Sequence, residues 1–206
     1  MSEPAAAVLD HGGSADPATV VPVFFYDLGS FECYLAAEQI SSALPTVAEW
    51  VPVLESALQL PRAAPAREPA ARAAQVAALG LQPLRWPERW PPDTERAMLA
   101  ATYAKQIGRG VAFSLAAFRQ GFAGGRDLAD DSTILIAGAA CEMHPSAVLR
   151  ALGTRPVRQA LDAACVRACE AGVRELPAVA LGPVVLSGPA ALGEAAAVLA
   201  RGRDDG

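Results

Sequence analysis

One stretch near the amino end, in which an apolar run turns directly into a helical pattern, most constrains the fold. Residues 21–26, VPVFFY, have the β-branched and aromatic composition of a buried strand. Asp27-Leu28-Gly29 marks a tight turn, and the apolar residues that follow, up to Ile40, recur at helical spacing. The sequence therefore predicts a strand, a turn and a helix over residues 21–40.

Ser30 and Cys33 lie at the predicted start of this helix. The free N–H groups and the dipole at a helix N-terminus favour a thiolate or another anion. A purely structural role is also open, with Ser30 as the N-cap and Cys33 as a small buried residue.

A second stretch with strand character lies near the other end of the chain. Two apolar runs, residues 177–181 and 184–188, flank the turn residues Gly182-Pro183. This pattern predicts a β-hairpin that begins at Pro177. A further helical pattern follows over residues 190–199.

The middle of the chain has almost no strand signal. Residues 45–54 form one more predicted strand, parallel to the first because a helix separates the two. Helical patterns then fill residues 57–150. We predict an α/β chain with a central mixed sheet. In this prediction, residues 1–19 are a disordered leader, and residues 20–56 and 151–201 together form one domain. Residues 57–150 form an all-helical insertion.

The order and spacing of these elements resemble the DsbA-like branch of the thioredoxin-fold superfamily. Within it, the chain looks most like the group of 2-hydroxychromene-2-carboxylate isomerase and kappa-class glutathione transferase. That group has a Ser-Pro-Tyr-Ser-Tyr-Leu-Ala type turn, where this chain has Ser-Phe-Glu-Cys-Tyr-Leu-Ala from Ser30. Disulfide oxidoreductases of the branch have Cys-x-x-Cys here, so Cys33 falls on their second cysteine. Phe31 and Glu32 depart from the Pro-Tyr of the isomerase group.

The resemblance implies that glutathione is the cofactor and that Ser30 stabilises its thiolate. It also implies a cis bond between Leu176 and Pro177, with the Leu176 backbone pairing with the cysteinyl part of glutathione. Ser187 and Glu175 correspond to positions near the γ-glutamyl end. A trans proline that simply starts a strand is the alternative for Pro177.

A loop rich in proline and tryptophan, residues 84–92, is a second candidate surface. Trp86 and Trp90 are large apolar side chains that can cover a ligand, and Arg85 or Arg89 can pair with a carboxylate. The alternative is that both tryptophans attach the helical insertion to the sheet.

We therefore expect a glutathione-dependent isomerase or transferase that acts on a small aromatic or electrophilic substrate. Two alternatives stay open. The chain can be a DsbA-like thiol protein with a degenerate Ser-x-x-Cys motif that reacts through Cys33, or a binding protein without enzymatic activity. The related group commonly forms homodimers, and the resemblance implies the same here.

Composition excludes other classes. A formal net charge of −5 and a pI near 5.1 argue against nucleic-acid binding. No apolar run reaches roughly 18 residues, so we expect no membrane segment. The amino end lacks the basic start of a signal peptide, which predicts a cytoplasmic protein. Cys165 and Cys169 share a predicted helix face without further ligands, so we expect buried cysteines there and no metal site.

Overall fold

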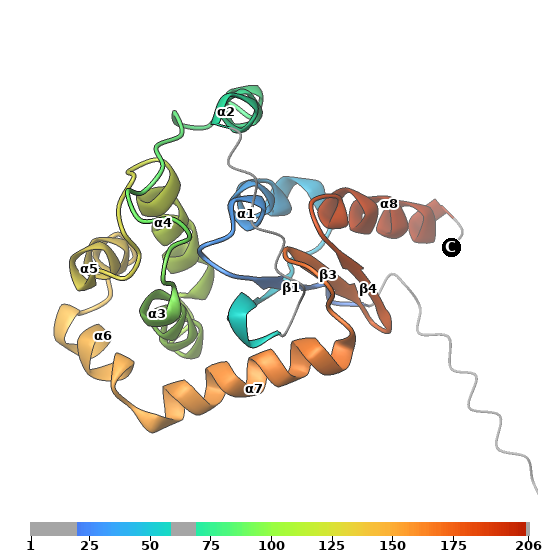
Figure 1. Ribbon diagram of the computed structural model, residues 1–206. Coiled ribbons are helices and arrows are strands. Elements are labelled where there is room, and N and C mark those ends of the chain that lie inside the picture. The colour runs from blue at the N-terminus through green and yellow to red at the C-terminus, as the bar shows by residue number, and fades with distance from the viewer. Residues whose placement is uncertain (1–19, 59–68, 205–206) are drawn as a thin grey trace, which may run out of the picture.

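A computed structural model of the chain describes residues 20–58 and 69–204 (Figure 1). The predicted disordered leader, residues 1–19, lies outside the described residues. Four short strands form one mixed sheet in the order β2-β1-β3-β4. The strands are β1 (Val23–Tyr26), β2 (Glu49–Pro52), β3 (Ala178–Leu181) and β4 (Val184–Ser187).

The strand pairing confirms the predicted sheet. β1 pairs in parallel with β2, and Phe24 lies opposite Trp50. β1 also pairs with β3 in antiparallel register, with Val179 opposite Phe24, so the two ends of the chain share one sheet. β3 and β4 form the predicted hairpin, which turns at Gly182, where φ is +60°.

Helices cover both faces of the sheet. Figure 1 shows α1 (Phe31–Ala43) and α8 (Ala191–Asp204) on one face and α7 (Arg155–Ala171) on the other. α1 is buried on most of its circumference, because it packs on α4 and α8 as well as over the strands. This wide burial explains why the apolar residues of α1 do not form a narrow stripe.

Between β2 and β3 the described residues form helices and no strand, as predicted. A short 3₁₀ turn, η2 (Glu55–Ala57), follows β2. The α-helices that precede α7 are α2 (Pro69–Ala78), α3 (Glu95–Gln106), α4 (Gly110–Phe122), α5 (Asp131–Ala139) and α6 (Pro145–Leu152). No strand occurs within residues 95–150, all of which are described. The division into domains at residues 57 and 150 stays a prediction.

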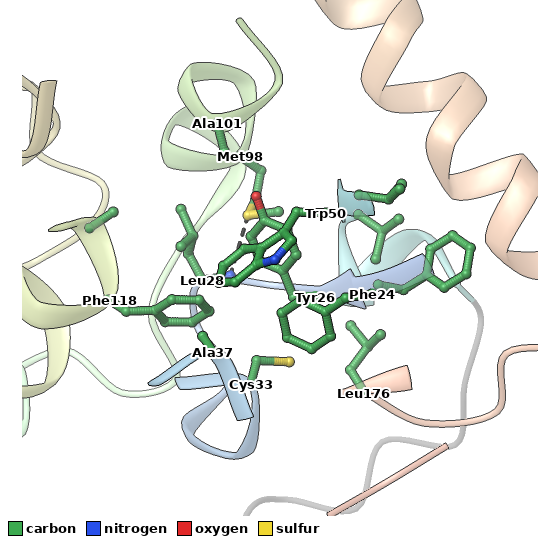
Figure 2. Close-up of a cluster of buried hydrophobic side chains, with 14 of the residues drawn as sticks. Phe24, Tyr26, Leu28, Cys33, Ala37, Trp50, Met98, Ala101, Phe118 and Leu176 are labelled. Atoms are coloured by element: carbon green, nitrogen blue, oxygen red, sulfur yellow. Dashed lines mark hydrogen bonds between the residues drawn. The ribbon is translucent and has the colours of Figure 1, made fainter. Parts of the chain in front are cut away.

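The hydrophobic core is continuous from the sheet into the helical part. Phe24 and Tyr26 on β1 stack with ring centroids 5.4 Å apart, and Trp50 on β2 meets Tyr26 edge-on. Phe118 on α4 extends the cluster, with its ring 5.9 Å from that of Tyr26. Figure 2 shows these rings together, beside a hydrogen bond of 3.3 Å from the backbone N–H of Leu28 to the sulfur of Met98. The helical part is thereby packed directly against β1, the strand that leads to Ser30.

Within the described part of the chain, none of the helices has the length and apolarity needed to cross a membrane.

Candidate active site

A cleft of about 1100 Å³ opens at the carboxyl end of β1. Its walls come from the β1–α1 turn, η2, α2, the loop of residues 84–92 (the tryptophan loop) and the segment before β3. The cleft thus lies between the sheet and the inserted helices. Among the lining residues are Asp27, Ser30, Phe31, Glu32, Glu55, Arg72, Trp86, Arg89, Trp90, Glu175 and Leu176.

Ser30 lies at the start of α1, as the sequence predicted, where it is the N-cap, and it lines this cleft. Its Oγ accepts a hydrogen bond of 3.2 Å from the backbone N–H of Cys33, and its own N–H donates to the carbonyl oxygen of Asp27 at 3.1 Å. Because the cap uses only a lone pair of Oγ, the hydroxyl hydrogen can point to the Cys33 sulfur or to a ligand in the cleft. The N-terminus of α1 is therefore a polar, electropositive position inside the cleft.

Asp27 is a site residue that the sequence reasoning missed. Its side chain is only 4% exposed, although it lines the cleft. Oδ1 accepts from the N–H of Gly29 at 2.8 Å, and Oδ2 accepts from the N–H of Glu55 at 2.9 Å. The carboxylate therefore holds the β1–α1 turn against η2. The sequence feature that could have identified Asp27 is that it is an acidic residue directly after six apolar ones.

Cys33 does not reach the cleft. It is 0% exposed and lies in the buried cluster with Tyr26, Ala37 and Leu176 (Figure 2). Burial raises the pKa of the Cys33 thiol far above its usual range, and the hydrogen bond with Ser30 offsets only part of this effect. A buried, protonated thiol is a poor nucleophile. Of the two candidate catalytic residues, only Ser30 is placed to meet a ligand.

The segment before β3 carries Leu176, which lines the cleft. The bond between Leu176 and Pro177 is cis, as predicted. Pro177 is buried, and its carbonyl oxygen accepts from the N–H of Gly188 at 2.8 Å. Ser187 is not among the lining residues, and its Oγ accepts from the N–H of Arg174 at 3.3 Å. Of these three cofactor-site candidates, Leu176 alone lines the cleft.

Trp86 and Trp90 line the cleft and also pack on helices α1 and α4. Their rings are edge-on with centroids 4.6 Å apart, and both line the cleft. Both also pack on Phe122 of α4, and Trp86 lies 5.6 Å from the ring of Phe31 on α1. The tryptophan loop is therefore at once a wall of the cleft and a link between α1 and the inserted helices. The bond between Trp90 and Pro91 is a second cis bond, which the sequence reasoning did not foresee.

The charged residues of the cleft are mainly acidic. Arg72 on α2 forms an ion pair with Glu32 on α1 and lies over the Phe31 ring, 4.7 Å from its centroid. Arg89 is more loosely held, with its Nε 3.8 Å from Asp127. Two arginines thus face six carboxylates: Asp27, Glu32, Glu55, Asp93, Glu95 and Glu175. Arg72 is a second site residue that sequence reasoning missed, and no local pattern around it signals its role.

The other cysteines lie outside the cleft. Cys165 is buried, and its Sγ accepts from the N–H of Leu54 at 3.3 Å. Cys169 is exposed, so the expectation that both cysteines are buried is wrong for Cys169. α7 presents only part of its surface to the sheet, and Cys169 lies outside that part. Among the described residues, no group of three or more His, Cys, Asp or Glu side chains could hold a metal ion.

The relation of this chain to known proteins is visible in its structure and not in its sequence. No family model matches the chain, and no curated protein matches it. Solved structures do match. A structure of 2-hydroxychromene-2-carboxylate isomerase superposes with a TM-score of 0.77 at 15% identity, over 88% of this chain and 95% of the isomerase. A probable DsbA oxidoreductase from Streptomyces coelicolor superposes with a TM-score of 0.71 at 18% identity, over 91% of each chain.

The chain has a DsbA-like thioredoxin fold. The cytosolic disulfide reductase DsbM from Pseudomonas aeruginosa shares this fold, with a TM-score of 0.66 at 17% identity over 91% of this chain and all of DsbM. A structure of DsbM with GSH matches with a TM-score of 0.63. In this chain, Ser30 lines the cleft at the start of α1.

Proposed function

We propose that the chain is a glutathione-dependent isomerase or transferase that acts on a small aromatic or electrophilic substrate. One observation carries this proposal. Ser30 lines the cleft at the N-terminus of α1, whereas Cys33 is wholly buried, so the site has a position for a thiolate but no reactive thiol of its own. A thiol-bearing ligand supplies what the chain lacks. Bound glutathione would provide the nucleophilic thiolate.

The residues of the cleft fit such a ligand. Ser30 donates its hydroxyl hydrogen to the sulfur, and the α1 dipole favours the negative charge. Leu176 lies just outside β3 and offers its backbone to the cysteinyl part. Glutathione carries one ammonium and two carboxylates; Glu175 suits the ammonium, and the loosely held Arg89 suits a carboxylate. The rings of Trp86 and Trp90 then form an apolar wall for an aromatic substrate.

A thiol oxidoreductase is the second candidate, since DsbM and the probable DsbA oxidoreductase share the fold. Such chemistry requires an accessible thiol, and Cys33 is 0% exposed. A binding protein without activity is the third candidate. The excess of carboxylates in the cleft favours it, because these charges oppose an anionic ligand.

Calorimetric titration of the full chain with glutathione separates these candidates. We expect binding, and we expect weaker binding to the Ser30→Ala variant at a pH where the bound sulfur is ionised. S-Methylglutathione serves as the matched ligand control, because it has no ionisable thiol and its affinity should not change in Ser30→Ala. An absence of binding at millimolar glutathione contradicts the proposal and leaves the other two candidates.

We also propose that the chain is a cytoplasmic homodimer. The cytosolic DsbM shares its fold, and the isomerase group that the sequence resembles commonly pairs. Light scattering on the purified full chain measures the mass directly. A mass near that of the 21.2 kDa chain at micromolar concentration contradicts the dimer.

A further inference from the structure

Phe31 and Glu32 distinguish this cleft from the isomerase-group motif. They form the first turn of α1 directly after Ser30, and both line the cleft. Glu32 therefore places a carboxylate beside the position where the proposed function requires a thiolate. A like charge opposes the ionisation of a neighbouring thiol. Without compensation, Glu32 would cancel part of the stabilisation that the helix N-terminus provides.

Arg72 compensates for both unusual residues. Its guanidinium forms an ion pair with the Glu32 carboxylate and stacks on the Phe31 ring at 4.7 Å. The side chains of Arg72 and Glu32 are only 21% and 20% exposed. Partial burial reduces the screening by water, so this pair has a stronger field than an ion pair on an open surface. Burial lowers the pKa of the Arg72 guanidinium from its usual value, and the group still carries its charge at neutral pH.

The helix that carries Arg72 has little other polar character. α2 reads PAARAAQVAA, with Arg72 as its one charged residue and Val76 as its buried residue. The guanidinium is thus the principal polar group that α2 brings to the cleft wall. The alanine-rich composition of α2 therefore leaves Arg72 as the only charge that this helix can place in the cleft wall.

We propose that Arg72 controls the ionisation of the thiol held at Ser30. It neutralises Glu32 and adds a positive charge to the cleft wall, so that the α1 N-terminus can hold a thiolate despite the acidic surroundings. Arg72 is a positioning residue, because it acts on the sulfur through Glu32 and through the local field. The identity of the sulfur as that of glutathione rests on the proposed function. The effect of Arg72 and Glu32 on the charge at the α1 N-terminus does not.

The other charges around the site must stay fixed in any test. They come from each wall of the cleft and comprise five more carboxylates and one more arginine: Asp27, Glu55, Asp93, Glu95, Glu175 and Arg89. Variants confined to Arg72 and Glu32 leave this background unchanged. A difference between such variants therefore reports on the pair alone.

A thiol built into the chain is the most direct reporter. The full-length variant Ser30→Cys, Cys33→Ala, Cys169→Ser places a thiol at the N-terminus of α1 and removes its disulfide partner and the exposed cysteine, while Cys141 and Cys165 stay buried. The rate of alkylation at position 30, followed by peptide mapping across pH, gives the thiol pKa. In this background Arg72→Met should raise the pKa by about 1 unit, and Glu32→Gln should lower it by about 1 unit. The double change should return it close to the reporter value.

Helix α1 provides a matched control pair. Glu38 binds Arg119 through two hydrogen bonds of 2.7 Å, two turns beyond Ser30. Arg119→Met should leave the thiol pKa unmoved. The proposal is overturned if Arg72→Met and Glu32→Gln both leave the pKa unmoved, or if both shift it in the same direction. Should Arg72→Met fail to fold, Arg72→Gln takes its place, because it also removes the positive charge and must raise the pKa.

The reporter separates this inference from the proposed function, because its thiol belongs to the chain. Shifts of opposite sign in a protein that does not bind glutathione support the role of Arg72 and contradict the cofactor. Glutathione binding with an unmoved reporter pKa supports the cofactor and contradicts the role of Arg72.

Discussion

Tyr26 at the end of β1 and Ser114 in the middle of α4 are joined by a hydrogen bond of 2.6 Å between their hydroxyl oxygens. Both side chains are buried, with 1% and 0% exposure. The bond therefore ties the sheet to the inserted helices across 88 positions of sequence, immediately behind the turn that presents Ser30. Removing this hydrogen bond should therefore affect both the stability of the fold and the position of α1.

The two partners are not equivalent, and a double-mutant cycle should show it. Ser114→Ala leaves the Tyr26 hydroxyl buried without a partner and should cost about 1–3 kcal/mol of unfolding free energy. Tyr26→Phe should cost less, about 1 kcal/mol, because the serine hydroxyl can turn to a backbone carbonyl of its own helix. The double variant should be more stable than the sum of the two losses implies. Urea unfolding of the four proteins measures this, and strictly additive losses would contradict the link.

Cysteine accessibility gives a second prediction. Of the four cysteines, only Cys169 is exposed; Cys33, Cys141 and Cys165 are buried. A thiol reagent should therefore titrate one thiol in the native chain and all four in urea. Cys169→Ser should remove the native reaction. Rapid labelling of Cys33 under native conditions, identified by peptide mapping, would contradict its placement in the core.

Activity should depend on Ser30 rather than on Cys33. With glutathione and a chlorodinitrobenzene electrophile, Ser30→Ala should lower turnover by roughly one to two orders of magnitude, as expected for the loss of one charge-assisted hydrogen bond. Cys33→Ser should keep most of the activity, since the buried thiol does not meet the ligand. The inverse pattern, with Cys33→Ser inactive and Ser30→Ala active, indicates a thiol protein instead.

The pH dependence of stability should include a contribution from Glu49 on β2. Burial alone raises the pKa of this carboxyl, but Lys105 at 2.7 Å and Arg167 at 3.2 Å outweigh it, so the pKa is lowered on folding. A lowered pKa stabilises the fold above the unfolded-state pKa, and this stabilisation is lost as pH falls through the folded-state pKa. Between neutral pH and about pH 3, Glu49→Gln should therefore lose less stability than the parent chain.

The expected difference for Glu49→Gln is below about 1 kcal/mol, because the side chain is 39% exposed and water screens the pair. Urea unfolding at both pH values and at two salt concentrations measures it. Equal losses for parent and variant would show that the Glu49 pair contributes nothing to stability.

The sequence was sufficient for the fold because its signals are local. The apolar run that ends at Tyr26 and the hairpin that begins at Pro177 each identify a strand without knowledge of any partner. The helix after Ser30 follows from its cap and its periodicity, and Ser30 is indeed the N-cap. These elements depend on neighbours in sequence, so pattern reasoning finds them.

The walls of the cleft depend on contacts between distant segments, which no local pattern encodes. Arg72 is a single charge in an alanine-rich helix, and only the folded chain shows that it meets Glu32 and Phe31. Asp27 reads as a turn residue until its bond with the N–H of Glu55 is visible. The resemblance placed Ser187 near a ligand; in the structure its hydroxyl oxygen accepts from the backbone N–H of Arg174, and Ser187 is not among the residues that line the cleft.

The ionisation of bound glutathione tests the central claim most directly. Ultraviolet absorbance of the thiolate, titrated across pH with the ligand bound to the full chain, reports the pKa of the sulfur. The account predicts a pKa about one to two units below that of free glutathione, and a return of about one unit toward the free value in Ser30→Ala. Bound glutathione that ionises at the same pH as free glutathione would contradict the assignment of the α1 N-terminus as a thiolate site.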